Sequence, residues 1–153
     1  MNANTIIYDG RVDRAAMIRF YEERTVGKIN LIVNGHAIRV DELIKKSKLS
    51  GKGYKDFQEK LDLEVSNMVN QVKQSSSTSL SDLFKDQVSF AAKNLDMGVG
   101  SICRVNQPRR ISEDVLLKRP LLGDTTLEQG WNGIGKSEKM RIISMIRKGI
   151  AEG

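Results

Sequence analysis

A glycine-rich segment near the end of the 153-residue chain carries the residue types of a phosphate-binding loop. The eight residues from Gly130 to Ser137 fit the pattern G-x-x-x-x-G-K-[ST] at each fixed position, with Lys136 as the lysine. In such a loop, backbone N–H groups wrap the phosphates, while the lysine and the hydroxyl reach the terminal phosphate and Mg²⁺. The segment therefore raises the hypothesis of a P-loop nucleotide binder.

The residues around this segment lack the parts that a nucleotide-binding loop needs. A buried strand should lead into it, but residues 124–129 are Asp-Thr-Thr-Leu-Glu-Gln. Only one more predicted helix follows, so no later strand supplies the acidic residue that holds the metal. We therefore expect Gly133 and Gly135 to turn one helix into the next, with Lys136 in solvent and Ser137 as the following N-cap. A third reading keeps the exposed N–H groups as a site for a DNA phosphate, without catalysis.

Other catalytic arrangements find little support in the residue inventory. With one His and one Cys, His36 and Cys103, the chain offers no zinc cluster and no Cys-His or Ser-His site. His36 follows an Asn-Gly turn signal and is expected to be exposed. Carboxylates that are adjacent in sequence, such as Glu22 and Glu23, diverge rather than converge. We expect no catalytic residue, no cofactor, no metal and no enzymatic activity.

The composition fits one domain with a thin core. Hydrophobic residues make up 39% of the chain and aromatic residues only 5%, against 29% charged residues. Part of the chain is therefore expected to be extended or to depend on partners. No apolar run approaches the roughly 20 residues of a membrane span, so we expect no membrane span and no membrane partner during assembly.

The net charge of +6 is concentrated in the last third of the chain. Residues 104–153 carry ten Lys and Arg against six Asp and Glu, which accounts for four of the six charges. This distribution suits an ordinary amphipathic helix with a wet face, or a surface that neutralises nucleic-acid phosphates. The candidate DNA or partner contacts are Arg104, Arg109, Arg110, Arg119, Lys136, Arg141, Arg147 and Lys148.

The N-terminal third, residues 1–50, is predicted to hold an arm, a helix and a small β-hairpin. The helix covers about residues 14–26 and the hairpin residues 29–40. Asn34-Gly35 suits a type I′ turn, because both central residues of that turn need positive φ.

The middle of the chain, residues 51–98, is predicted to be an antiparallel helical hairpin. Two apolar stripes with spacings of three and four flank the polar run 74–79, which is the predicted linker. Each stripe is narrow, so further helices from this chain or a neighbour are needed to cover it. The stripes are Tyr54, Phe57, Leu61, Val65, Met68 and Val72, then Leu80, Phe84, Val88, Ala91 and Leu95.

The last part, residues 99–153, is predicted to be a basic connector followed by C-terminal helices, the first capped by Thr125 or Thr126. The expected fold class is mainly α: a long antiparallel helical hairpin with a small N-terminal β-hairpin and a C-terminal helical segment.

The C-terminal segment also carries a recognisable arrangement of residues. The pattern L-x-x-G-W-x-x-I runs from Leu127 to Ile134, and R-I-x-x-x-I-R-x-G-I-x-x-G runs from Arg141 to Gly153. This arrangement resembles a segment of tailed-phage minor head proteins, the phage Mu protein F-like head morphogenesis family. Members of that family continue beyond this helix, so we expect either a shortened relative or part of a larger protein.

The resemblance implies a structural protein of a tailed-phage virion, located in the capsid interior or head–tail region after assembly in the host cytoplasm. It implies portal or capsid protein as partner, an oligomeric assembly, and contact with the backbone of packaged double-stranded DNA that is ejected. No catalytic residue is carried over. The implied packing positions are Trp131, Ile134, Ile142 and Ile146, and the implied exposed contacts are Arg141 and Arg147.

Two other functions stay open from the sequence. One is a small basic DNA-binding or regulatory module, whose affinity would fall steeply with salt. The other is the P-loop nucleotide binder, in which Lys136→Ala would abolish nucleotide binding.

Overall fold

The computed structural model is almost entirely helical. It describes residues 3–47, 49–99, 118, 120–122 and 124–152. The helices of this part are α1 (Ala3–Lys46), α2 (Lys52–Val99) and α4 (Leu127–Glu152). None of them is long and apolar enough to cross a membrane. The predicted class, mainly α, is confirmed for these residues.

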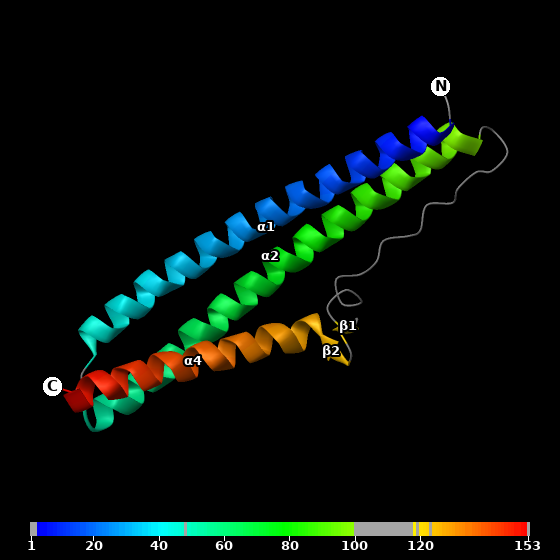
Figure 1. Cartoon of the computed structure of the whole chain (residues 1–153). Coiled ribbons are helices and arrows are strands. Elements are labelled where there is room, and N and C mark those ends of the chain that lie inside the picture. The colour runs from blue at the N-terminus through cyan, green and yellow to red at the C-terminus, as the bar shows by residue number, and fades with distance from the viewer. Residues whose placement is uncertain (1–2, 48, 100–117, 119, 123, 153) are drawn as a thin grey trace.

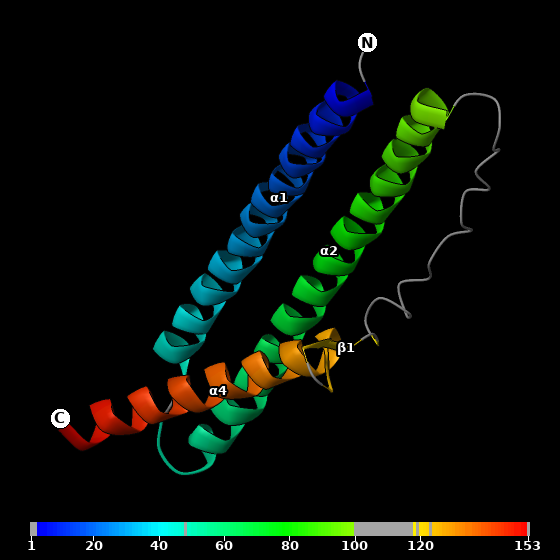
Figure 2. The same cartoon turned by 45° about the vertical axis from the view of Figure 1, so that its right-hand side comes forward.

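The helices form a long rod that is thicker at one end. α1 and α2 lie side by side and antiparallel, and α4 lies against the first half of α2 (Figure 1). With 48 residues, α2 is about 70 Å long at the usual helical rise of about 1.5 Å per residue. In both views the N-terminal part of α1 and the C-terminal part of α2 extend well beyond α4 (Figure 2). We call this two-helix part the distal half.

A short antiparallel strand pair leads into α4. β1 (Pro120–Leu122) pairs with β2 (Thr125–Thr126), which is followed directly by the helix. Thr126 Oγ1 accepts a hydrogen bond from the Gln129 backbone N–H at 3.2 Å, and Gln129 Oε1 accepts one from the Thr126 N–H at 2.9 Å. This reciprocal pair is a capping box, so the predicted cap at Thr126 is confirmed.

The core lies at the thick end, where α4 joins the hairpin. Phe57, Leu61, Val65 and Val69 recur every four residues along α2 and are buried with Ile143 of α4. The first predicted stripe is therefore the buried side of α2. Partly buried residues that pack against this cluster are Val40, Leu43, Ile44, Leu49, Tyr54, Met68, Trp131, Ile142 and Ile146.

The predicted β-hairpin over residues 29–40 is wrong, because that segment lies inside α1. The predicted arm and the predicted end of a first helix near residue 26 are wrong too, because α1 runs unbroken from Ala3 through both. Ile29, His36 and Leu43 are seven residues apart, and in a helix this spacing places them on one side of α1. There His36 is buried, Ile29 is half-buried and Leu43 packs against the core cluster. Packing along α2 thus overrides the local turn preference of Asn-Gly.

The predicted linker over residues 74–79 is also wrong, because α2 runs through it without a break. Ser76, Ser77 and Ser79 are 5%, 2% and 6% exposed, so one side of this polar run faces the interior. The antiparallel hairpin is instead made by α1 and α2. Its turn contains Gly51 at φ 54°, a left-handed conformation that glycine adopts without strain.

Candidate functional site on the C-terminal helix

The segment that matches the phosphate-binding pattern is helix. Gly130 to Ser137 all lie inside α4, which runs unbroken from Leu127 to Glu152. In the interior of an α-helix the backbone N–H groups bond to carbonyls four residues earlier, so they cannot wrap a phosphate. The expected turn at Gly133 and Gly135 and the expected N-cap at Ser137 are therefore both wrong. The expectation that Lys136 is exposed is confirmed.

Gly135 has a packing role that explains why a glycine stands there. A Cβ built on Gly135 would lie 2.5 Å from Cγ2 of Val69 and 3.8 Å from Cγ1 of Val65. Real carbon atoms do not approach so closely, so α4 can meet α2 at this point only without a side chain. A Cβ at Gly133 would meet nothing within 4 Å. The glycine closest to the lysine in the pattern therefore serves helix–helix contact.

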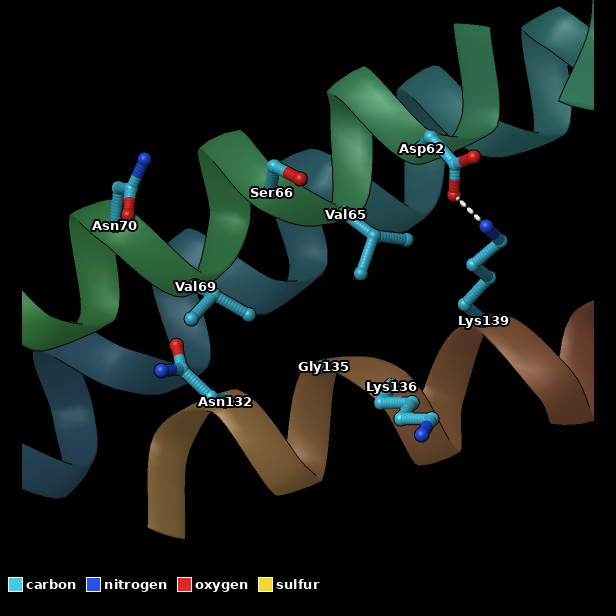
Figure 3. A pocket seen from close by; sticks show the side chains of 9 residues that line it. All are labelled: Asp62, Val65, Ser66, Val69, Asn70, Asn132, Gly135, Lys136 and Lys139. Atoms are coloured by element: carbon cyan, nitrogen blue, oxygen red, sulfur yellow. Dashed lines mark ion pairs between the residues drawn. The ribbon is translucent and has the colours of Figure 1, made fainter. Parts of the chain in front are cut away.

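A shallow groove of about 250 Å³ lies beside this contact (Figure 3). Lys139 of α4 and Asp62 of α2 form an ion pair across it, and Asn132 points towards α2. Asp62 is the only acidic residue among those that line the groove, and it is paired with Lys139. The lining offers polar contacts but no nucleophile with an adjacent base. The lining residues are Asp62, Val65, Ser66, Val69, Asn70, Asn132, Gly135, Lys136 and Lys139.

Polar contacts fix the position of α4 along α2. They occur near both ends of the contact and in its middle, so they set which turns of the two helices face each other. Arg147, one of the predicted partner contacts, takes part in them through its guanidinium Nε. The contacts are Lys73 Nζ to Glu128 Oε1 at 3.6 Å, Lys139 to Asp62, and Arg147 Nε to Tyr54 Oη at 3.3 Å.

The side of α4 that points away from the hairpin is partly apolar. Ile134, Arg141, Met145 and Lys148 are spaced seven, four and three residues apart, which places them along one line on the helix. We call these four residues the outer face of α4. Ile134 is 51% exposed and Met145 is 67% exposed. The Arg141 side chain is 70% exposed and forms an ion pair with Glu138 at 3.0 Å.

The packing positions implied by the family resemblance are confirmed in three of four cases. Trp131, Ile142 and Ile146 pack against the core cluster. Ile134 does not, because it lies on the outer face of α4 and is half exposed. Trp131 faces the core although its indole N–H has no hydrogen-bond partner among the described residues.

The predicted basic contacts do not form a single cluster on α4. Arg141 and Lys148 share the outer face, whereas Lys136 and Arg147 lie on a neighbouring side of the helix. The other four candidates lie outside the described residues, and so does almost all of the predicted basic connector. Those four are Arg104, Arg109, Arg110 and Arg119.

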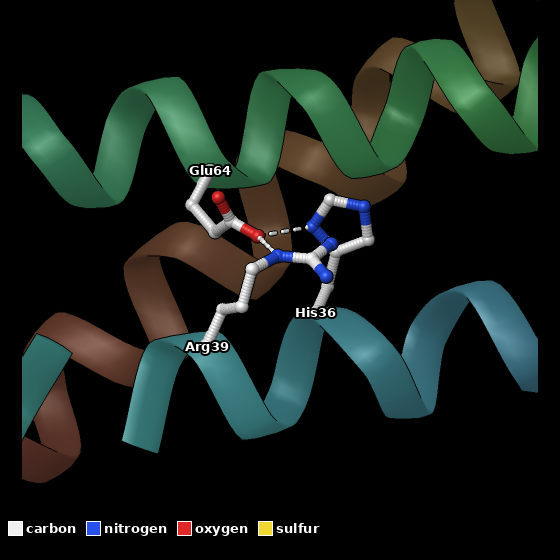
Figure 4. A network of polar contacts seen from close by, with 3 residues as sticks. All are labelled: His36, Arg39 and Glu64. Carbon is white, nitrogen blue, oxygen red and sulfur yellow. Dashed lines mark hydrogen bonds and ion pairs between the residues drawn. The ribbon is translucent and has the colours of Figure 1, made fainter. Parts of the chain in front are cut away.

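A polar network around the buried His36, between α1 and α2, is the feature that the sequence did not predict (Figure 4). His36 is 2% exposed, which contradicts the expected exposed position. Its Nδ1 lies 2.5 Å from Oε1 of Glu64, and Arg39 Nε donates to the same oxygen. An ionised carboxylate only accepts hydrogen bonds, so Nδ1 carries the hydrogen. The other ring nitrogen, Nε2, is buried without a hydrogen-bond partner among the described residues.

The protonation of this network favours a charged carboxylate. Partial burial by itself raises the pKa of Glu64, but hydrogen bonds from Arg39 and His36 outweigh it and lower the pKa. A second cross-helix contact joins Tyr21 Oη to Asp86 Oδ2 at 2.5 Å. That hydrogen bond raises the pKa of Tyr21 to about 12. Both contacts tie α1 to α2 and hold the hairpin in register.

Within the described ranges, no group of three or more His, Cys, Asp or Glu residues could hold a metal ion. No family model, no curated protein and no solved structure matches the chain. The family resemblance of the C-terminal segment therefore rests on its motif alone.

Proposed function

We propose that this chain is a structural protein of a tailed-phage virion, which binds a portal or capsid protein through the outer face of α4. The observation that carries the proposal is this face itself, where exposed apolar and basic side chains alternate along one line of a helix. The residues of the family-like motif lie on the same helix. A structural role is further supported by the polar side chains of the hairpin, which link one helix to another.

The outer face of α4 has the chemistry of a helix that docks on a partner. Ile134 and Met145 are exposed large apolar residues that a groove on a partner would cover. Arg141 and Lys148 stand beside them on the same line, so a partner surface with acidic residues around an apolar groove fits best. The polar contacts between α4 and α2 hold the outer face in place, which lowers the conformational entropy that is lost on binding.

A co-sedimentation experiment with tailed-phage portal and capsid proteins from the same source as this chain tests the proposal. Met145→Asp places an uncompensated charge in the centre of the outer face, and we expect it to weaken binding about tenfold or more. Leu63→Asp is a matched control, because Leu63 is 63% exposed on α2 and does not belong to this face. Equal binding by both variants, or no binding by the unmodified chain, contradicts the proposal.

DNA-backbone binding is the second candidate, and the exposed basic side chains of α4 favour it. Lys136 and Arg141 are exposed and reach solvent on two sides of the helix. Each phosphate that they neutralise adds about 0.9 to the slope of log affinity against log salt concentration. A steep slope without any assembly partner would favour this function, and a flat salt dependence would exclude it.

A further inference from the structure

A second surface, on α1, is only half covered within the chain. Seven residues of α1 follow one another at alternating spacings of three and four, and the same spacing continues through His36 and Val40. His36 is buried and Val40 packs against the core cluster, because the thick end of the rod covers them. We call the seven residues that precede them the α1 stripe. They are Val12, Ala15, Arg19, Glu22, Val26, Ile29 and Val33.

The α1 stripe loses cover where the rod becomes two helices thick. Val33 is 39% exposed, Val26 is 56% exposed and Val12 is 52% exposed, whereas Ile29 is half-buried. α2 shows the same change, since Val69 meets α4 and Leu80, eleven residues further along, is 38% exposed. An alternation of three and four is the pattern by which helices pack in coiled coils. In the distal half this pattern has no helix of the described chain against it.

The α1 stripe is long enough for a whole helix to pack along it. From Val12 to Val33 it spans about 30 Å at the usual helical rise of about 1.5 Å per residue. A partner on the α1 stripe can therefore be another helix of similar length.

The residues of the α1 stripe complement the same stripe in reverse order. With a two-fold axis between residues 20 and 21, Arg19 of one copy faces Glu22 of the other. In the same register the small Ala15 faces the larger Val26. Opposite charges and complementary sizes thus meet in an antiparallel pair, which is the self-complementarity that a two-fold interface requires.

We infer that two copies of this chain dimerise through their α1 stripes, which pack antiparallel so that the two distal halves form a four-helix bundle. Helical hairpins commonly complete their packing in this way. The two symmetry-related Arg19–Glu22 pairs set the register, as polar residues do within coiled-coil seams. The inference goes beyond the virion assignment and does not use α4, so either can fail without the other.

Reversing the charges of Arg19 and Glu22, singly and together, tests the dimer, because the double variant should restore what each single variant weakens. Light scattering after gel filtration should give twice the mass of 17.1 kDa for the unmodified chain. Arg19→Glu alone puts like charges together, and so does Glu22→Arg, so each should raise the dimer Kd about tenfold or more. The double variant R19E/E22R restores opposite charges and should restore the dimer.

Leu31→Asp is the control, because Leu31 is 75% exposed on α1 but lies outside the stripe. It should leave the dimer intact, and circular dichroism should show unchanged helix content in all variants. A monomer at every concentration overturns the inference. So does a dimer that the single charge reversals leave unchanged, or one that the double variant fails to restore.

Discussion

The contact of α4 with α2 at Gly135 leaves no room for a side chain larger than hydrogen. Gly135 lies against Val69, and a methyl group at this position would meet Cγ2 of Val69 at 2.5 Å. We therefore expect Gly135→Ala to lower the free energy of unfolding by about 1–3 kcal/mol, as overpacking of a core does. Urea denaturation followed by circular dichroism measures this change directly.

The matched control for this prediction lies two residues earlier on the same helix. Gly133 has open space where a Cβ would stand, so Gly133→Ala brings only the gain in helix propensity. That gain is up to about 1 kcal/mol in favour of the folded state. If both substitutions stabilise the protein equally, α4 does not approach α2 at Gly135.

The carboxylate of Glu64 on α2 bonds to two side chains of α1, one of which is the buried His36. Glu64→Gln removes the charge that Arg39 and His36 share, and we expect a loss of about 1–3 kcal/mol at neutral pH. The pKa of Glu64 is lowered on folding. Its contribution is therefore complete above the unfolded-state pKa of about 4.3 and is lost as the pH falls through the lower folded-state value.

The difference in stability between the variant and the unmodified chain should consequently narrow below about pH 4. Denaturation curves of both proteins at several pH values between neutral and acid conditions measure this narrowing. A difference that stays constant over this range would show that the charge of Glu64 contributes nothing.

At the scale of elements, the sequence predicts apolar periodicity well and helix boundaries poorly. The stripe from Tyr54 to Val72 is visible because its residues repeat at helical spacing, and it is the buried side of α2. The Asn34-Gly35 signal misleads, because contacts with a helix distant in sequence outweigh local turn chemistry. The serine run 74–79 misleads for the same reason, since small side chains fit between helices as readily as they form linkers.

The candidate site shows the same division between local and tertiary information. The inward positions Trp131, Ile142 and Ile146 are implied by the family resemblance and are confirmed. The role of Gly135 could not be predicted, because only the position of Val69 on another helix explains it. For His36 the sequence holds a partial signal of burial, which is its seven-residue spacing from the core-packed Leu43. In the structure this helical spacing decides its position, and not its place next to Asn-Gly.

Helix continuity across the misleading turn signal can be measured with one substitution. A Cβ on Gly35 would meet only Arg39 Nη1, at 3.7 Å, and Gly35 does not have positive φ. Gly35→Ala should therefore raise the free energy of unfolding by up to about 1 kcal/mol, as for a glycine inside a helix. In a type I′ turn the same change would destabilise the protein, because alanine disfavours positive φ.

At the scale of the whole molecule, the chain is a rod with a small core at one end. The core cluster and α4 stabilise the thick end, and the distal half has only two helices side by side (Figure 1). Such a shape exposes much of its apolar surface, which agrees with the few large side chains in the composition. A protein of this shape gains stability from partners along its length, and that expectation links the proposed virion role to the proposed dimer.

Cross-linking mass spectrometry on tailed-phage particles purified from the source of this chain tests the proposed function most directly. We expect peptides of the chain within the particles, and lysine cross-links from Lys148 of α4 to portal or capsid protein. Lys148 belongs to the outer face, so its links report the predicted contact. Particles that lack the chain, or cross-links confined to other parts of it, would contradict the account.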